Sequence, residues 1–338
     1  MAVLRCQPLN HFIVGIRLHV HKRFNTLGTI LLTIRTMPRQ RMCTLIIFHL
    51  QKHKRANRQL QEKMALSEKR SRAELSSFVE SYWSYQGRAQ EELILFPDGT
   101  FNIIYASAPL IFMNEGRSFK LGFYLVPLAA TPIRLFSNRA IYGVRFKAFS
   151  LPNILKGKDP QLTSINALDQ LEISTTAFHH LSTELKRQGE PEEILTLLET
   201  LAYELLRPDL RVHESLREKV NYILHRRGQV RIEKMAADFG VSRQGLHKHF
   251  MKSLSTSPKQ LSAIWQLNHF FALSAGSDDS LTGRALDAGY YDQAHFNHQF
   301  SSTFGSAPSA FIRSNSEVLR FAKDSMIKRF SNYYDPEI

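Results

Sequence analysis

Cysteine is scarce in this sequence and absent after residue 63, since the two cysteines are Cys6 and Cys43. A disulfide scaffold, a cysteine-ligated zinc site and a cysteine nucleophile are therefore excluded from most of the chain. Histidine is missing between His53 and His179, so a metal-binding β-barrel in that stretch would lack its imidazole ligands. The scattered acids there have no base, nucleophile or Gly-rich phosphate loop beside them. We expect no enzyme activity, no catalytic residues, no metal and no cofactor.

Long apolar runs are lacking as well. The runs near the start cover residues 26–34 and 44–50, far short of the ~20 residues needed to cross a bilayer. His, Arg and Lys interrupt these runs repeatedly, which is untypical of a signal peptide. We expect a cytoplasmic protein with no membrane partner.

Acidic residues are almost absent from residues 1–63, which hold 12 Lys and Arg against the single acid Glu62, or 12 − 1 = +11. The net charge of the chain is +14, so the other residues carry only 14 − 11 = +3 and give little support for a polyanion partner. The basic segment is either a transit peptide or an arm on nucleic acid, or it is not translated because the protein begins at Met64. We predict a disordered extension or, preferably, a start at Met64.

The middle of the chain combines two patterns. Over residues 75–155, short runs rich in β-branched and aromatic residues alternate with turn signals such as Pro97-Asp98-Gly99, which predicts a small, mostly antiparallel sheet or barrel. Its many aromatic residues favour a filled core over a ligand cavity. Over residues 160–207, apolar residues recur at helical spacing, which predicts two or three amphipathic helices. The stripe from Ile194 to Leu205 suits either a core face or a subunit interface.

The last third contains an internal repeat with an offset of 50 residues. Residues 242–261 (SRQGLHKHFMKSLSTSPKQL) align with residues 292–311 (DQAHFNHQFSSTFGSAPSAF), and upstream an offset of 49 aligns Ala236 and Gly240 with Ala285 and Gly289. In each copy a small residue allows two helices to approach closely and the glycine permits a positive φ in the turn. Ser242 or Asp292 then caps the next helix. This is the pattern of a helix-turn-helix, and it occurs twice.

Burial of the apolar pair at i, i+4 in each second helix defines the face that points outward. Hydrogen-bonding and cationic side chains dominate this face, as they do in helices that read base edges in a major groove. The predicted DNA-binding residues are Arg243, Gln244, His247 and Lys248 in the first copy, and Gln293, Ala294, His295, Asn297 and His298 in the second.

From about Leu216 to Arg313 the sequence resembles the AraC/XylS family of bacterial transcription regulators, through VRIEKMAADFGVSRQGLHKHF, TSPKQL and SLTGRALDAGYYDQAHFNHQFSSTFGSAPSAF. The resemblance implies two three-helix subdomains joined by a helix over residues 258–274, with both recognition helices in successive major grooves of double-stranded DNA. It places base-facing positions at Gln244, His247, Lys248, Gln293, Ala294, His295 and His298. The chain departs from the family at Arg284, Gln266 and Ser255, where an apolar residue, Arg and Gly are usual.

Residues 78–155 are similar to the N-terminal sensor domain of one AraC-type subgroup, through FVESYW, LFPDGTFNIIY and VRF. The resemblance implies a small-molecule effector, and RNA polymerase and a second copy of the chain are further expected partners. We thus predict an α+β protein: an N-terminal basic extension (1–63), a small mixed, β-rich sensor domain with helices (64–210), an all-α double helix-turn-helix domain (211–315) and a tail (316–338).

The predicted function is a sequence-specific, DNA-binding transcription regulator. The alternative is a ligand-binding or partner-binding protein whose helix-turn-helix module is degenerate. Residues 213–315 carry only 12 − 8 = +4, which keeps this alternative open.

Overall fold

The structure is a computed structural model, and it describes residues 32–35, 42–45, 67–86, 92–156, 162, 164–168, 183–184, 191–206, 213–273 and 280–314. The chain divides into two compact units, residues 1–63 and residues 64–338. In the first unit, strand β1 (Leu32–Arg35) pairs antiparallel with β2 (Met42–Leu45). Everything below concerns the second unit.

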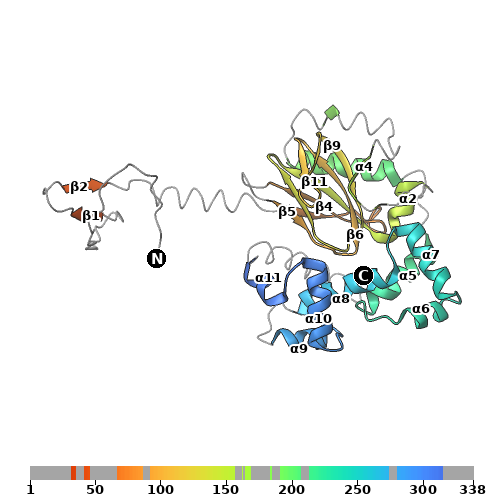
Figure 1. Ribbon diagram of the computed structural model, residues 1–338. Coiled ribbons are helices and arrows are strands. Elements are labelled where there is room, and N and C mark those ends of the chain that lie inside the picture. Colours follow the sequence, from red (N-terminus) through yellow and green to blue (C-terminus); the bar gives the residue numbers. More distant parts are fainter. Residues whose placement is uncertain are drawn as a thin grey trace. The chain divides into compact units, whose positions relative to one another are not determined.

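A six-stranded antiparallel sheet forms the centre of the β-rich domain (Figure 1). The two strands in the middle of this sheet, β6 (Thr100–Ala106) and β11 (Ile141–Lys147), are rich in aromatic and β-branched residues. Nearly every residue in them is buried because both faces of the sheet are covered. In spatial order the strands are β12 (Asn166–Ala167), β9 (Gly122–Val126), β6 (Thr100–Ala106), β11 (Ile141–Lys147), β4 (Val79–Tyr85) and β3 (Ser67–Arg70).

A smaller four-stranded antiparallel sheet covers one face of the first. Its strands, in spatial order, are β5 (Leu93–Leu95), β10 (Ile133–Ser137), β7 (Leu110–Phe112) and β8 (Arg117–Phe119). Side chains of both sheets form one apolar cluster, which includes Trp83, Ile104, Leu110 and Leu135. The expectation of a β-rich domain whose aromatic residues fill the core is confirmed, since Trp83, Phe101 and Tyr105 are at most 1% exposed.

Helix α4 (Pro191–Leu206) packs on strands β4 and β11, on the other face of the large sheet (Figure 1). Ile194, Leu198, Leu201 and Leu205 are buried there, so the apolar stripe is a core face.

The expected helices over residues 160–207 are only partly observed. Asn166–Ala167 is not helical but pairs as β12 with Leu125 and Tyr124 of β9, because the edge of β9 offers backbone partners that helical spacing does not reveal. Residues 169–182, which contain much of the other expected helix, lie outside the described residues.

The C-terminal region is all helical, as expected. Its helices are α5 (Glu214–His225), α6 (Ile232–Asp238), α7 (Arg243–Leu254), α8 (Pro258–Leu273), α9 (Leu281–Asp287), α10 (Gln293–Phe304) and α11 (Pro308–Ser314). The connecting helix expected over residues 258–274 is α8; Ser274 lies outside the described residues.

The β-rich domain and the helical region share an apolar core. One continuous cluster joins Phe146 and Leu151 of the β-rich domain to Leu246, Phe250 and Trp265 of the helical region. The 3₁₀ turn η1 (Ala148–Ser150) and helix α2 (Leu151–Leu155) lie at this junction, since η1 contacts α5 and α7, and α2 contacts α7.

A second contact between them is the 96–99 turn, the segment from Phe96 to Gly99. The carbonyl oxygen of Pro97 accepts a buried hydrogen bond of 3.1 Å from Asn268 Nδ2 on α8. Gly99 has φ +75°, and a Cβ on it would lie 2.7 Å from Trp265 Nε1, so only glycine fits against this helix. The Phe96 ring packs against both Phe304 and Phe311, at centroid distances of 5.9 and 6.4 Å. This turn therefore ties the β-rich domain to α8 and to the aromatic core around α10 and α11.

Candidate DNA-binding surface

The first helix-turn-helix consists of α6 and α7. Gly240 adopts φ +63° after α6, which reverses the chain. The Ser242 hydroxyl then accepts a 3.0 Å hydrogen bond from the Gly245 amide and caps α7. Leu246 and Phe250 are at most 1% exposed, which fixes the rotation of α7 about its axis. Turn, cap and buried pair all lie where the sequence predicts them.

The second helix-turn-helix consists of α9 and α10 and repeats this geometry. Gly289 has φ +81°, and the Asp292 carboxylate accepts a 2.7 Å hydrogen bond from the His295 amide. Phe296 and Phe300 are at most 1% exposed. A carboxylate at this position also interacts favourably with the positive end of the helix dipole.

The structure leaves all nine predicted DNA-binding residues exposed on α7 and α10. They are Arg243, Gln244, His247, Lys248, Gln293, Ala294, His295, Asn297 and His298. Arg243 also pairs with Glu233 of α6 at 3.1 Å, but both side chains are about two-thirds exposed or more, so water and salt weaken the pair. Ala294 has no donor or acceptor in its side chain and can only make apolar contacts, such as one to a thymine methyl.

Helix α8 joins the two helix-turn-helix units, α6–α7 and α9–α10. Its residues Leu261 and Trp265 belong to the core of the first unit, and Leu267, Phe270 and Phe271 belong to the core of the second. Gln266, where the AraC/XylS family prefers Arg, donates a 3.3 Å hydrogen bond from Nε2 to the carbonyl oxygen of Ala288. That bond anchors the turn of the second unit on the connecting helix.

The departure at Ser255 also has a structural explanation. Ser255 ends α7 in the left-handed conformation, with φ 52°, where glycine would be less strained. Its hydroxyl accepts a 3.2 Å hydrogen bond from the Leu162 amide of the β-rich domain, which a glycine could not do. The serine thus fastens the end of the first recognition helix to the N-terminal domain.

Tyr291 is a candidate that sequence reasoning missed. From the sequence we interpret the pair Tyr290-Tyr291, beside Gly289, as turn packing rather than base stacking. Tyr290 is buried, at 3% exposure, but Tyr291 is 88% exposed directly before the cap of α10. Val241 holds the same place before α7 and is 38% exposed. Both residues directly precede a helix cap, Ser242 or Asp292, and that place in the sequence is the signal that could have identified them.

Two capped helices with exposed polar faces, carried by one connecting helix, define the molecule as a DNA-binding protein with a double helix-turn-helix. The comparisons agree: residues 235–314 match the family model described as a helix-turn-helix domain. This region is an AraC-type helix-turn-helix domain, the DNA-binding module of a transcription regulator.

Among solved structures the chain is similar to ToxT from Vibrio cholerae. One ToxT crystal structure is 13% identical, with 68% of this chain and 97% of that chain covered and a TM-score of 0.40. A ToxT bound to (E)-4-(8-methylnaphthalen-1-yl)but-3-enoic acid is 12% identical, with 70% and 97% covered and a TM-score of 0.40. No curated protein sequence matches the chain.

No helix within the described residues is long and apolar enough to span a membrane. Within the same residues, no three His, Cys, Asp or Glu side chains gather as metal ligands would.

Proposed function

We propose that this chain is a cytoplasmic, sequence-specific regulator whose helices α7 and α10 read two successive major grooves on one face of double-stranded DNA. The observation that carries the proposal is the repeated geometry: two capped helices, each with a polar exposed face, fixed to one helix α8. Successive grooves on one face of B-DNA are about 34 Å apart, so the two helices should contact half-sites about 10 base pairs apart.

Base recognition would come from the middle of each polar face. Gln244, His247 and Lys248 of α7 and Gln293, His295 and His298 of α10 can donate hydrogen bonds to purine acceptors. Lys252, exposed near the end of α7, and Tyr291, exposed before α10, would contact phosphates.

The test is selection from randomised duplex DNA with the purified full chain, at two salt concentrations. A motif with two half-sites about 10 base pairs apart, retained at the higher salt concentration, is the expected result. Retention that is independent of sequence and lost with salt, or no retention, would favour the alternative of a degenerate module that binds another ligand or partner.

Single variants then separate base contacts from phosphate contacts. His247→Ala and His295→Ala should each lower binding to the selected site by about 1–3 kcal/mol and leave binding to random DNA nearly unchanged. Lys252→Ala should weaken both and reduce the salt dependence. His213→Ala is the matched control, because His213 is also exposed but precedes α5 and belongs to neither α7 nor α10. Equal losses on both DNAs for the histidine variants would contradict the assignment.

Regulation by a small effector is part of the proposal, because the β-rich domain contacts the DNA-binding region through both its core and the 96–99 turn. Contact with RNA polymerase and homodimer formation stay predictions.

A further inference from the structure

The turn of the second helix-turn-helix is in contact with the 226–230 loop, which connects α5 to α6. A Cβ on Gly289 would lie 2.3 Å from Gln229 Cδ and 2.6 Å from both Gln229 Nε2 and Oε1, so the Gln229 carboxamide lies directly against this glycine. The equivalent Gly240 of the first unit also has a positive φ, but a Cβ on it would meet no atom of the described residues within 4 Å. Two turns of like conformation thus differ, because the second is in contact with a loop that precedes the first unit.

The 226–230 loop is itself fixed on helix α8. A Cβ on Gly228 would lie 2.2 Å from the carbonyl oxygen of Ser262 and 2.3 Å from the nitrogen of Gln266, so backbone lies directly on backbone at this crossing. The amides of Arg227, Gly228 and Gln229 donate hydrogen bonds of 2.8 to 3.0 Å to carbonyl oxygens that precede them in the chain. The loop therefore has little freedom to move relative to α8.

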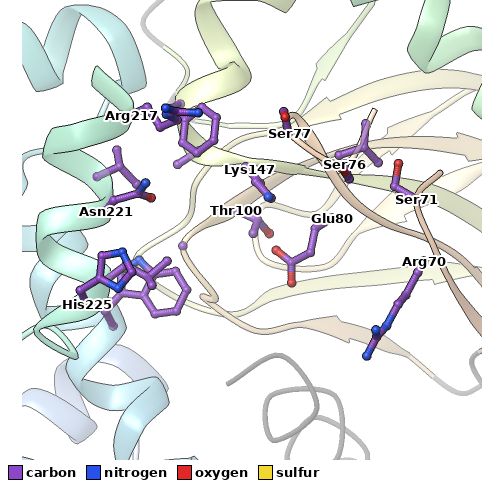
Figure 2. A pocket seen from close by; sticks show the side chains of 17 residues that line it. Arg70, Ser71, Ser76, Ser77, Glu80, Thr100, Lys147, Arg217, Asn221 and His225 are labelled. Carbon is purple, nitrogen blue, oxygen red and sulfur yellow. The ribbon is translucent and has the colours of Figure 1, made fainter. Parts of the chain in front are cut away.

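Helix α5, which leads into this loop, is fixed in turn by the β-rich domain. The 3₁₀ turn η1 contacts α5, and Val220 and Ile223 belong to the core that the two regions share. Figure 2 shows Asn221 and His225 of α5 on one side of a cavity of about 520 Å³ and Lys147 of β11 on the other. The loop thus starts from a helix whose position is set by the sheet domain.

Two further carboxamides attach the second unit to α8. Gln266 Nε2 donates its 3.3 Å hydrogen bond to the carbonyl oxygen of Ala288, the residue before Gly289. Gln299 Nε2 of α10 donates a 2.9 Å hydrogen bond to the carbonyl oxygen of Ala263 on α8. The Ala288-Gly289 turn is therefore in contact with two carboxamides, one from the 226–230 loop and one from α8.

The place of this turn determines where α10 would meet DNA. Helix α10 begins at Gln293, just after the turn, and Gln293, Ala294 and His295 at its start are among the predicted base-reading residues. One additional base pair between two half-sites rotates the second by about 35° and moves it by about 3.4 Å. A turn that is held in one place therefore matches half-sites at one spacing.

We propose that Gln229 and Gln266 are positioning residues that set the spacing of the two DNA half-sites. Their carboxamides hold the Ala288-Gly289 turn on the 226–230 loop and on α8, so that α7 and α10 present their polar faces at a fixed separation before DNA binds. The chain then recognises one half-site spacing rather than several. This inference rests on the proposed function, since it names what sets the geometry of the DNA site.

Binding of the full chain to duplexes of different half-site spacing tests the proposal. The half-sites found by selection are placed at the selected spacing and at one base pair more or less. We expect the selected spacing to bind roughly tenfold or more tighter than its neighbours. In the double variant Gln229→Ala, Gln266→Met this ratio should fall to roughly threefold or less. A loss of stability alone would weaken binding at every spacing by the same factor and leave the ratio unchanged.

Gln260→Ala is the matched control. Gln260 is an exposed glutamine of the same helix, and its Oε1 accepts a 3.1 Å hydrogen bond from Thr256 Oγ1, four residues away in the chain. Its replacement should leave the spacing ratio as it is. The double variant should fold, because Gln229 is exposed, Gln266 is half-buried, and neither belongs to an apolar core.

Pulsed electron paramagnetic resonance tests the same contact without DNA. Spin labels attached through Lys252→Cys and Ser302→Cys, equivalent exposed positions of α7 and α10, report the distance between the two helices. Cys6→Ser and Cys43→Ser remove the other thiols. We expect one narrow distance distribution when both glutamines are present, and a distribution roughly twofold or more broader in the double variant.

Three outcomes would overturn the proposal: a spacing ratio that the double variant leaves unchanged, a distance distribution that stays as narrow, or equal binding of the full chain to adjacent spacings. Failure of the selection to recover any motif would instead refute the proposed function. The distance measurement needs no DNA, so the two failures are distinguishable.

Discussion

The two helix-turn-helix units have nearly the same backbone geometry but different cores. The first unit buries Leu246, Phe250 and Leu254 in a cluster that continues without interruption into the sheet domain. The second has an aromatic core of its own, in which Phe296, Phe300, Phe304 and Phe311 contact one another at centroid distances from 4.5 to 5.6 Å. Among the described residues of the sheet domain, Phe96 alone packs against this second core.

Two copies of a sequence repeat therefore need not be coupled in the same way to the stability of the rest of the protein. Because the first helix-turn-helix unit shares its core with the β-rich domain, this unit and the sheet should unfold together, with one free energy of unfolding. The second unit should be able to open while the rest of the molecule stays folded. Substitutions at equivalent positions of the two units distinguish these two behaviours.

Truncation of the central phenylalanine in each unit gives the largest effect. Phe250→Ala and Phe300→Ala should each cost about 3–5 kcal/mol, because both rings are fully buried. In native-state hydrogen exchange, Phe250→Ala should reduce protection in α7 and in strands β4 and β11 together. Phe300→Ala should reduce protection in α10 and leave the strands unchanged. Loss of protection in the strands of the Phe300 variant would refute the asymmetry.

Substitution of glycines by alanine should destabilise the protein less. Two such variants separate the cost of a positive φ in a turn from the cost of a close contact with α8. Gly228 has φ +76°, and a Cβ on it would lie 2.2 Å from the Ser262 carbonyl oxygen and 2.3 Å from the Gln266 nitrogen. Gly228→Ala should therefore destabilise the protein by about 2–5 kcal/mol in chemical denaturation. Gly240→Ala is the control: it has a similar φ but open space, and should cost only about 1–2 kcal/mol. Equal costs of the two substitutions would show that α8 moves away from residue 228 to make room for the added Cβ.

A fall in pH should destabilise α8, the helix that joins the two helix-turn-helix units. Burial and the Arg227 guanidinium 3.4 Å away lower the pKa of His269 to about 4. Because its pKa in the unfolded chain is near 6.5, the folded state disfavours protonation, so His269 contributes stability above pH 6.5 that is lost as the pH falls toward 4. We expect a loss on the order of 1–3 kcal/mol in urea denaturation over this range. His269→Gln should flatten the profile; parallel profiles would contradict the assignment.

Removal of the helix caps gives the smallest effect. Ser242→Ala and Asp292→Ala should each cost about 1 kcal/mol, and Asp292→Ala a few tenths more because a carboxylate also interacts with the helix dipole. Asp292→Ser should restore the hydrogen bond but not the charge, and so separate the two contributions. Thermal denaturation is the measurement, and a larger loss for Ser242→Ala would reverse the expected order.

Features that depend on neighbours in the sequence could be predicted. The caps at Ser242 and Asp292 and the buried pairs in α7 and α10 follow from spacing within one helix, and the exposed polar faces follow from those pairs. Strand β10 could not be found, because Pro132 precedes it and Arg134 interrupts it, and only its partners β5 and β7 make it a strand.

Features that depend on distant partners were hidden for a different reason. Nothing in the local pattern of Ser255 or Asn268 shows that their partners are the Leu162 amide and the Pro97 carbonyl. Local pattern therefore identifies the exposed faces of α7 and α10 but not the contacts that join the β-rich domain to the helical region.

The hydrogen bond between Pro97 and Asn268 joins residues that are 171 positions apart, which has a consequence during protein synthesis. A ribosome adding ~5–20 residues per second needs roughly 10–30 s to reach Asn268 after it has made Pro97. During that interval Phe96 has none of its aromatic partners, and the surface of η1 and α2 that α7 will cover is exposed. The nascent β-rich domain thus waits with exposed apolar surface for the helices that complete it, and it is a natural client for a chaperone at the ribosome exit.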